Sequence, residues 1–159
     1  MVSLFRPKKT TPRLERLRNL SLFVNLTPPE LRIVDGLLHE RDYLAGEVIF
    51  DEGEEGQAIY IVASGEVLIC RQGQGEIGAV AHLSAGTFFG ELALLDNSPR
   101  SAQARAATAS QLIVFFRDDF VGLLDTHARI ASKISRELAR HLGARMRDMA
   151  LAYGAHQHL

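Results

Sequence analysis

The stretch FFGELALLDNSPRSAQA, residues 88–104, carries the residue types from which the rest of the chain can be interpreted. FG followed by ELALL predicts one short turn of helix, whose first backbone N–H groups have no partner within the helix. Free amides and the positive end of a helix dipole attract an anion. Gly90 has no Cβ, so the backbone can approach a ligand closely. The stretch therefore predicts a small anion-binding turn.

The second half of the stretch returns hydrogen-bond donors to that turn. The turn-forming residues DNSP bring the chain back and place Arg100 and the Ser101 hydroxyl near it. The planar donor fork of Arg100 suits a phosphate, and Ser101 can add one more hydrogen bond. Glu91, an acceptor when ionised, suits a donor such as a ribose hydroxyl. A ligand with both a phosphate and a sugar is a nucleotide, so the stretch predicts a nucleotide site. The alternative interpretation is that Glu91 and Arg100 form an exposed ion pair of little energetic consequence.

The stretch resembles the phosphate-binding cassette of the cyclic nucleotide-binding domains. The pattern of that cassette is FGE, two or three aliphatic residues, a short turn, and then PR, a small residue and Ala. GEEGQAIYIVASGEV, residues 53–67, is similar to the glycine-punctuated strand pair of the same family, and the resemblance extends from about residue 22 to about residue 142. It implies an α+β fold: an antiparallel, jelly-roll-like β-roll with N-terminal helices, a short cassette helix and a long C-terminal helix.

The resemblance also implies roles for individual residues. In the family, the cassette Glu holds the ribose 2′-hydroxyl, the Arg and the helix-turn amides hold the cyclic phosphate, and the C-terminal helix covers the base. The ligand-binding set implied here is Phe89, Gly90, Glu91, Leu92, Arg100, Ser101 and Ala102. Val80, Arg140 and Arg145 are candidates for the base wall or lid, although each arginine could instead be a solvated surface residue. The Ser101 hydroxyl is compatible with contact to phosphate or to guanine.

By this resemblance the chain is a regulatory module that senses a 3′,5′-cyclic purine nucleotide and relays the signal by moving its C-terminal helices. The expected ligand is cAMP, with cGMP as the second candidate. The alternatives are a ligand-free scaffold of the same fold and a sensor of another cyclic nucleotide or dinucleotide. We expect no catalysis, because hydrolysing a cyclic phosphate would need a metal set or a poised base beside the phosphorus. The six histidines show no metal-ligand spacing, so neither a metal nor a further cofactor is expected.

Length and composition fit one domain in the cytoplasm. The chain has 159 residues, 47% of them hydrophobic, which is ample for a core. Its net charge of −1 gives no general attraction to nucleic acid or anionic membranes. The sequence contains no apolar run of membrane-spanning length and no signal peptide. Its single cysteine, Cys70, is predicted to be a small buried hydrophobic residue. We expect no DNA-binding domain, since the chain stops at Leu159 where transcription regulators of the family continue.

The chain is expected to divide into a basic segment, residues 1–20, and a single cyclic nucleotide-binding domain, residues 21–159. The first segment has six basic side chains and one acidic one, and it predicts a solvated terminus; contact with a membrane, RNA or an acidic partner is the alternative. Leucines from Leu14 to Leu20 predict a short amphipathic helix near its end. Thr27, Pro28 and Glu30 predict the start of a second helix.

Short apolar runs separated by turn residues predict the strands of the roll. These runs are residues 46–50, 58–63, 65–70, 77–83, 104–109 and 111–116. His39 and Glu40 are interpreted as the exit from the second helix toward the first strand. RQGQGE, residues 71–76, is interpreted as a hairpin tip.

After Phe116 the apolar period changes to 3.6, which predicts helices at residues 117–124 and 127–153, within a lid and dimerisation region of about 118–155. One apolar stripe runs along the second helix: Ile130, Ile134, Leu138, Leu142, Met146, Met149 and Tyr153. A helix of about 27 residues is near 40 Å long, more than a small roll can cover. The surplus is available to a second copy, so we expect a homodimer, with a swapped or monomeric lid as the alternative. The signal would then pass to a separate, unidentified protein.

Overall fold

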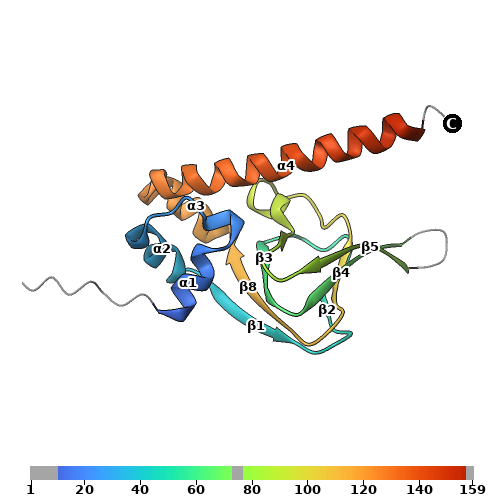
Figure 1. Ribbon diagram of the computed structural model, residues 1–159, viewed down its shortest axis with the longest axis horizontal. Coiled ribbons are helices and arrows are strands. Elements are labelled where there is room, and N and C mark those ends of the chain that lie inside the picture. Colours follow the sequence, from blue (N-terminus) through green and yellow to red (C-terminus); the bar gives the residue numbers. More distant parts are fainter. Residues whose placement is uncertain (1–10, 73–76, 157–159) are drawn as a thin grey trace, which may run out of the picture.

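The computed structural model describes residues 11–72 and 77–156. Three short helices gather at one side of a roll of strands, and one long helix runs across the roll from these helices to the far end of the strands (Figure 1). In chain order the helices are α1 (Pro12–Arg18), the 3₁₀ turn η1 (Ser21–Phe23), α2 (Pro28–Asp35), the 3₁₀ turn η2 (Glu91–Leu94), α3 (Arg117–Thr126) and α4 (Ala128–His156).

Within the described residues, eight antiparallel strands form two four-stranded sheets. The strands are β1 (His39–Tyr43), β2 (Val48–Phe50), β3 (Ala58–Ser64), β4 (Glu66–Gln72), β5 (Ile77–Ser84), β6 (Phe88–Phe89), β7 (Gln103–Ala106) and β8 (Ser110–Phe116). One sheet has the order β1-β8-β3-β6, and the other has the order β2-β7-β4-β5. The predicted α+β antiparallel roll with N-terminal helices, a cassette helix and a long C-terminal helix is confirmed.

Strands β3 and β8 are buried on both faces because they separate two parts of the core. Successive side chains of a strand point to opposite faces. Ile59 and Ile61 of β3 therefore pack toward the helices, while Tyr60 and Val62 pack inside the roll. The apolar run of β8 divides in the same way. The inside of the roll is thereby lined with aromatic rings, among them Tyr60, on which the site described below is built.

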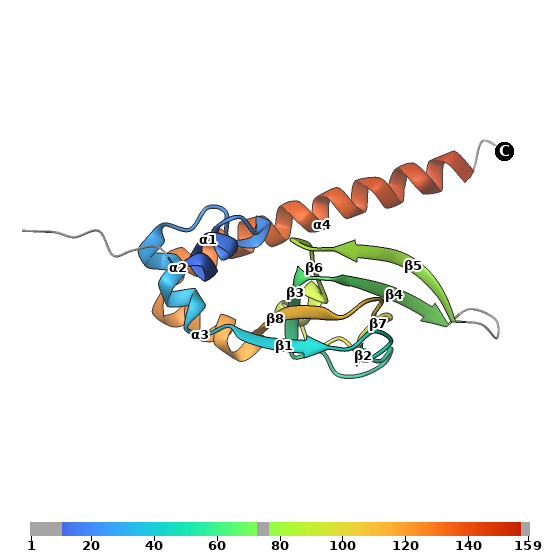
Figure 2. The same ribbon diagram turned by 60° about the horizontal axis from the view of Figure 1, so that its bottom comes forward.

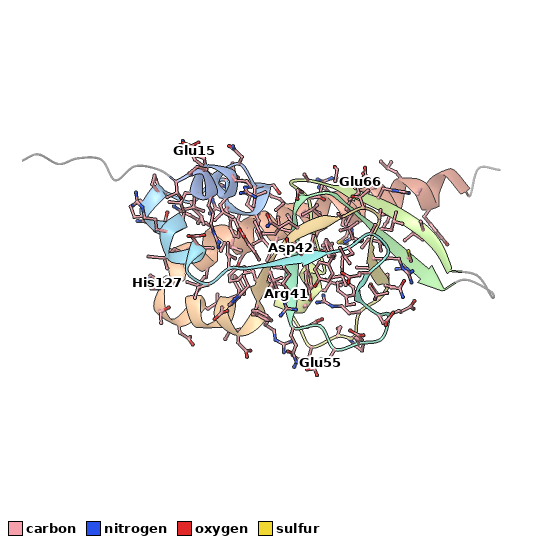
Figure 3. The ribbon with its side chains drawn as sticks, turned by 90° about the horizontal axis from the view of Figure 1, so that it is seen from below. Glu15, Arg41, Asp42, Glu55, Glu66 and His127 are labelled. Carbon is pink, nitrogen blue, oxygen red and sulfur yellow. The ribbon has the colours of Figure 1, made fainter. Side chains whose placement is uncertain are left out.

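Strand β1 corrects the interpretation of His39 and Glu40 as a helix exit, since both residues belong to the strand. β1 pairs along β8 from His39 opposite Val114 to Tyr43 opposite Ser110. Its first four residues are exposed, and Figure 3 shows Arg41 and Asp42 along this strand at the outside of the roll. The strand is formed by backbone pairing to a buried neighbour. It therefore lacks the apolar alternation that marks a half-buried strand in a sequence.

The N-terminal helices begin where the sequence predicts. Thr27 accepts a hydrogen bond from the backbone of Glu30, and the Glu30 carboxylate accepts one from the Thr27 backbone, which completes a capping box. Leu14 and Leu17 of α1 are buried in the core cluster shared with α2 and α4. The predicted helix within the basic segment is thus confirmed, and its apolar face belongs to the core between the helices and the roll. Residues 1–10 lie outside the described residues, as do residues 73–76 of the predicted hairpin tip.

The long helix α4 changes character along its length. Ile130, Ile134 and Leu138 are buried against the rest of the domain, whereas Met146 and Met149 are 71% and 70% exposed. Figure 2 shows α4 passing over the side of the roll that carries β6, with its C-terminal part rising away from strands β4 and β5. The predicted division of the apolar stripe into a covered and an uncovered part is confirmed.

Candidate functional site

The site begins at Gly90, where the chain turns from β6 into η2. Gly90 has a φ of +71°, in the left-handed region that side chains with a Cβ avoid. A Cβ at this position would lie 2.5 Å from Nη1 of Arg100, closer than such atoms approach. The predicted turn of helix after Gly90 is confirmed as the 3₁₀ turn η2. A glycine is therefore required both by the turn and by the arginine that lies against it.

Arg100 is held from both sides by backbone groups. Its own N–H donates to the carbonyl of Glu54 at 2.7 Å, and its carbonyl accepts from the N–H of Gly53 at 2.8 Å. Its guanidinium donates from Nη1 to the Gly90 carbonyl at 3.1 Å and from Nη2 to the Ala58 carbonyl at 2.8 Å. These contacts fix the side chain under the cassette turn.

Aromatic rings complete the surroundings of the guanidinium. Its central carbon lies 4.1 Å from the centre of the Phe50 ring and 5.6 Å from that of Tyr60. Such cation–π contacts offset part of the loss of hydration. The backbone at Gly56 passes so close that a Cβ there would lie 3.2 Å from the guanidinium carbon. The arginine thus occupies a fitted slot of the roll.

One donor of Arg100 has no partner. The residue is only 8% exposed, and its buried Nε makes no hydrogen bond to any described residue. Burial lowers the pKa of the Arg100 guanidinium below its ordinary value, since desolvation disfavours the charged form, and the charges of Tyr60, Glu54 and Glu91 oppose that shift. A buried, positively charged donor without an acceptor is costly, so the slot suits an incoming anion.

Glu91 is the buried carboxylate of the site. It is 2% exposed and stands at the first position of η2. Its Oε1 accepts a hydrogen bond from Nη1 of Arg145, and Nε2 of His141 lies 3.5 Å from the same oxygen. The His141 ring in turn packs on Phe88, with ring centres 4.3 Å apart. Two residues of α4, one helical turn apart, therefore reach the cassette.

A cavity of about 350 Å³ lies between the cassette, strands β4 and β5, and helix α4. The cassette side of the cavity includes Phe89, Gly90, Glu91, Leu92, Arg100, Ser101 and Ala102. The opposite side is formed by Ile69, Arg71, Val80, Ala81 and Leu83, and α4 contributes His141 and Arg145. Arg100 and Glu91 thus line one cavity together, and most of the other lining residues are apolar.

Every residue of the predicted ligand-binding set lines this cavity, and so do Val80 and Arg145 among the lid candidates. Arg140 does not line it, because its guanidinium points along the helix surface to Glu137 at 2.5 Å. His141 and Arg71 were missed by the sequence reasoning. A signal for His141 was present: His141 and Arg145 continue the buried stripe of Leu138 at three and seven residues, whereas Arg140 falls off that face.

Comparison with known proteins agrees with this geometry. The profile of the family described as "Cyclic nucleotide-binding domain" matches residues 40–127, more than half of the chain. The chain belongs to this cyclic nucleotide-binding domain family. The resemblance read from the cassette is confirmed.

Solved and curated members of the family resemble this domain closely. The cyclic AMP receptor protein of Thermus thermophilus is 36% identical over 127 residues, which cover 79% of this chain and 59% of the receptor. The crystal structure of the catabolite activator protein of the same species has a TM-score of 0.76 at 36% identity, covering 84% of this chain and 62% of the other. The regulatory domain of Toxoplasma gondii PKA with cAMP has a TM-score of 0.65 at 34% identity, covering 72% and 46%.

The matched region thus makes up most of this chain but spans less than two thirds of the length of each of these relatives. The family is one of regulatory binding domains. Among the residues that the structure describes, no helix has both the length and the apolar character needed to cross a membrane.

Proposed function

We propose that the chain is a regulatory module that binds a 3′,5′-cyclic purine nucleotide in the cavity between the cassette and α4 and changes none of its bonds. The observation that carries the proposal is the pair of buried charged side chains that line one cavity: Arg100, whose Nε has no acceptor among the described residues, and Glu91. The names of relatives, a cyclic AMP receptor protein and a PKA regulatory domain with cAMP, support cAMP as the first candidate to test.

The cyclic phosphate would lie against Arg100 and the turn at Gly90. Nη1 and Nη2 each give one N–H to a backbone carbonyl, and Nε makes no hydrogen bond to a described residue. Nε and the second N–H groups of Nη1 and Nη2 are therefore the donors that remain for phosphate oxygens. An ionised donor and acceptor form the stronger kind of hydrogen bond. The exposed hydroxyl of Ser101, next along the chain, is a candidate for a second contact. A phosphate oxygen in this slot would give the buried Nε of Arg100 an acceptor.

The ribose would lie against Glu91, because an ionised carboxylate accepts hydrogen bonds and the sugar 2′-hydroxyl donates one. The contacts from Arg145 and His141 both meet Oε1 of Glu91, so Oε2 can still accept. The base would then lie in the apolar part of the cavity, against residues such as Val80 and Leu83. Each part of the nucleotide thus meets side chains of matching chemistry.

The signal would pass through α4. Glu91 contacts the proposed ligand on one side and two α4 side chains on the other, so sugar binding and helix position share one carboxylate. A ligand shifts a conformational equilibrium only by its difference in affinity between the two states. When α4 lies against the cassette, as in this structure, Arg145 and His141 contact Glu91. The nucleotide would then bind this position of α4 more tightly than a position in which these contacts are broken. A partner protein of unidentified nature would read the position of the helix.

The exposed end of α4 supports a homodimer. Met146, Met149, Leu151 and Tyr153 are each at least 70% exposed, and most of them continue the apolar stripe of the helix. Contiguous exposed apolar side chains mark interaction surfaces. A second copy that presents the same stripe would cover them along a two-fold axis.

The test is to heat freshly purified protein, separate the released small molecules and identify any nucleotide by its mass. The emptied and refolded protein is then titrated calorimetrically with cAMP and with cGMP. We expect a cyclic purine mononucleotide in the first step or saturable binding in the second. If nothing is released and neither titration gives heat, the chain is a ligand-free scaffold. Release of a cyclic dinucleotide or a pyrimidine nucleotide would assign the cavity to a different ligand.

A further inference from the structure

We propose that His141 makes the affinity for the nucleotide depend on pH, because its protonated ring holds α4 to Glu91 and favours the incoming phosphate. This inference rests on the proposed function and deepens it, since it names a condition that regulates the same site. It treats His141 as a positioning residue, which acts through Glu91 and through its own charge.

His141 stands where α4 crosses the cassette. Its Nε2 lies 3.5 Å from Oε1 of Glu91, and its ring packs on Phe88 with ring centres 4.3 Å apart. Its side chain is 33% exposed, so it can exchange protons with the solvent. Among the described residues, His141 is the histidine that lines the cavity. Histidine is the side chain that ordinarily changes charge between about pH 5 and 8.

The nearest charged groups belong to η2 and to α4 itself. Glu91 of η2 is the acid that the ring faces, and Arg145, one turn further along α4, contacts the same carboxylate. One turn earlier on α4, the Glu137 carboxylate accepts a hydrogen bond from Arg140 at 2.5 Å. Glu91 is therefore the carboxylate with which a protonated His141 would pair.

The other charged side chains that line the cavity, among the described residues, are Arg71 of β4 and Arg100. Together with Arg145 they give the site three positive charges that an arginine does not lose. These charges oppose a further positive charge, whereas a cyclic nucleotide brings one negative charge into the same cavity. Nucleotide binding should therefore favour the charged form of His141 relative to the free protein.

The contact with Glu91 acts in the same direction. A protonated imidazole donates from both of its nitrogens and carries a positive charge that attracts the carboxylate. The face of an aromatic ring such as Phe88 also favours a neighbouring cation. Protonation would thus strengthen the contact that holds α4 against the cassette, which is the position of α4 that the proposed function links to tight binding.

Proton binding and nucleotide binding are then linked, and such a coupling is reciprocal. If the nucleotide favours the protonated ring, the protonated protein binds the nucleotide more tightly by the same factor. A cavity of about 350 Å³ is about 7 Å across, so the ring and the phosphate would lie about 8 Å apart. Two unit charges at about 8 Å, with an effective dielectric constant of about 40 for a partly exposed ring, change an affinity by about fivefold.

The test measures the dissociation constant for cAMP at about pH 5.5 and about pH 8. The wild type should bind cAMP about fivefold more tightly at the lower pH. His141→Gln, neutral at both pH values, and His141→Arg, charged at both, should each show no change, and the arginine variant should bind more tightly than the glutamine variant. Both substitutions introduce good helix formers, and circular dichroism at each pH should show that the variants fold.

The matched control is His82→Gln, which alters an exposed histidine of β5 that does not line the cavity and should keep the pH dependence of the wild type. Calorimetry in two buffers of different ionisation enthalpy counts the protons. At about pH 6.5 the wild type should take up a fraction of a proton as cAMP binds, and His141→Gln should take up none.

A wild-type affinity that does not change with pH would overturn the inference while the proposed function stands. The same conclusion would follow if His141→Gln retained both the pH dependence and the proton uptake. If the wild type binds neither cAMP nor cGMP at either pH, the inference and the proposed function fail together.

Discussion

Replacing Gly90 by alanine should damage the site in a way that can be calculated from its surroundings. The φ of +71° costs an alanine about 1–2 kcal/mol. The new Cβ would also lie 2.5 Å from Nη1 of Arg100, so the guanidinium must move and give up its 3.1 Å hydrogen bond to the Gly90 carbonyl. That bond contributes about 1 kcal/mol. The free energy of unfolding should therefore fall by about 2–3 kcal/mol.

The matched control is Gly86→Ala. Gly86 has a φ of +93°, and a Cβ there would meet no atom within 4 Å, so this variant carries the backbone strain without the clash. Urea denaturation should show a loss about 1 kcal/mol smaller for Gly86→Ala than for Gly90→Ala. Calorimetry should show weaker nucleotide binding, by about tenfold, for Gly90→Ala alone. Equal losses of stability together with unchanged affinities would refute the coupling between the turn and Arg100.

Two further predictions concern other parts of the molecule. A hydrogen bond from Lys133 lowers the pKa of Glu30 from 4.5 to about 2, so the stabilisation from this pair is present above about pH 4.5 and is lost as the pH falls toward 2. Lys133→Met should lower the free energy of unfolding by about 1 kcal/mol at pH 6 and leave it unchanged near pH 2 in urea titrations; equal losses at both pH values would contradict this. Met146→Glu combined with Met149→Glu should convert a dimer to a monomer in sedimentation equilibrium, whereas Arg147→Glu, off the apolar stripe, should not. A wild-type monomer would show that α4 does not dimerise the chain.

The elements that the sequence predicts best are those decided by neighbouring residues. The capping box at Thr27 and Glu30 needs only a spacing of three residues, and the turn at Gly90 needs only a glycine before a helical run. The cassette residues were also grouped correctly at the cavity, since their spacing within one short stretch brings them together.

Features that depend on packing between distant segments were harder to predict. Strand β1 forms because β8 offers it a backbone partner, and its own exposed residues carry no alternation. The approach of Arg145 and His141 to Glu91 depends on how α4 lies across β6, a relation between segments about 50 residues apart. Arg140 and Arg145 look alike in the sequence. The buried positions of Ile134 and Leu138 decide which of the two reaches the cavity.

The most direct measurement is the affinity of the wild type, Arg100→Gln and Arg140→Gln for cAMP and cGMP. The account predicts that both nucleotides lose at least about tenfold in affinity with Arg100→Gln, because a charge-assisted hydrogen bond to the phosphate is removed, and that Arg140→Gln binds like the wild type. Circular dichroism and the urea midpoint should show that each variant folds. Wild-type affinity for both nucleotides in folded Arg100→Gln would contradict the central claim that this buried guanidinium receives the phosphate.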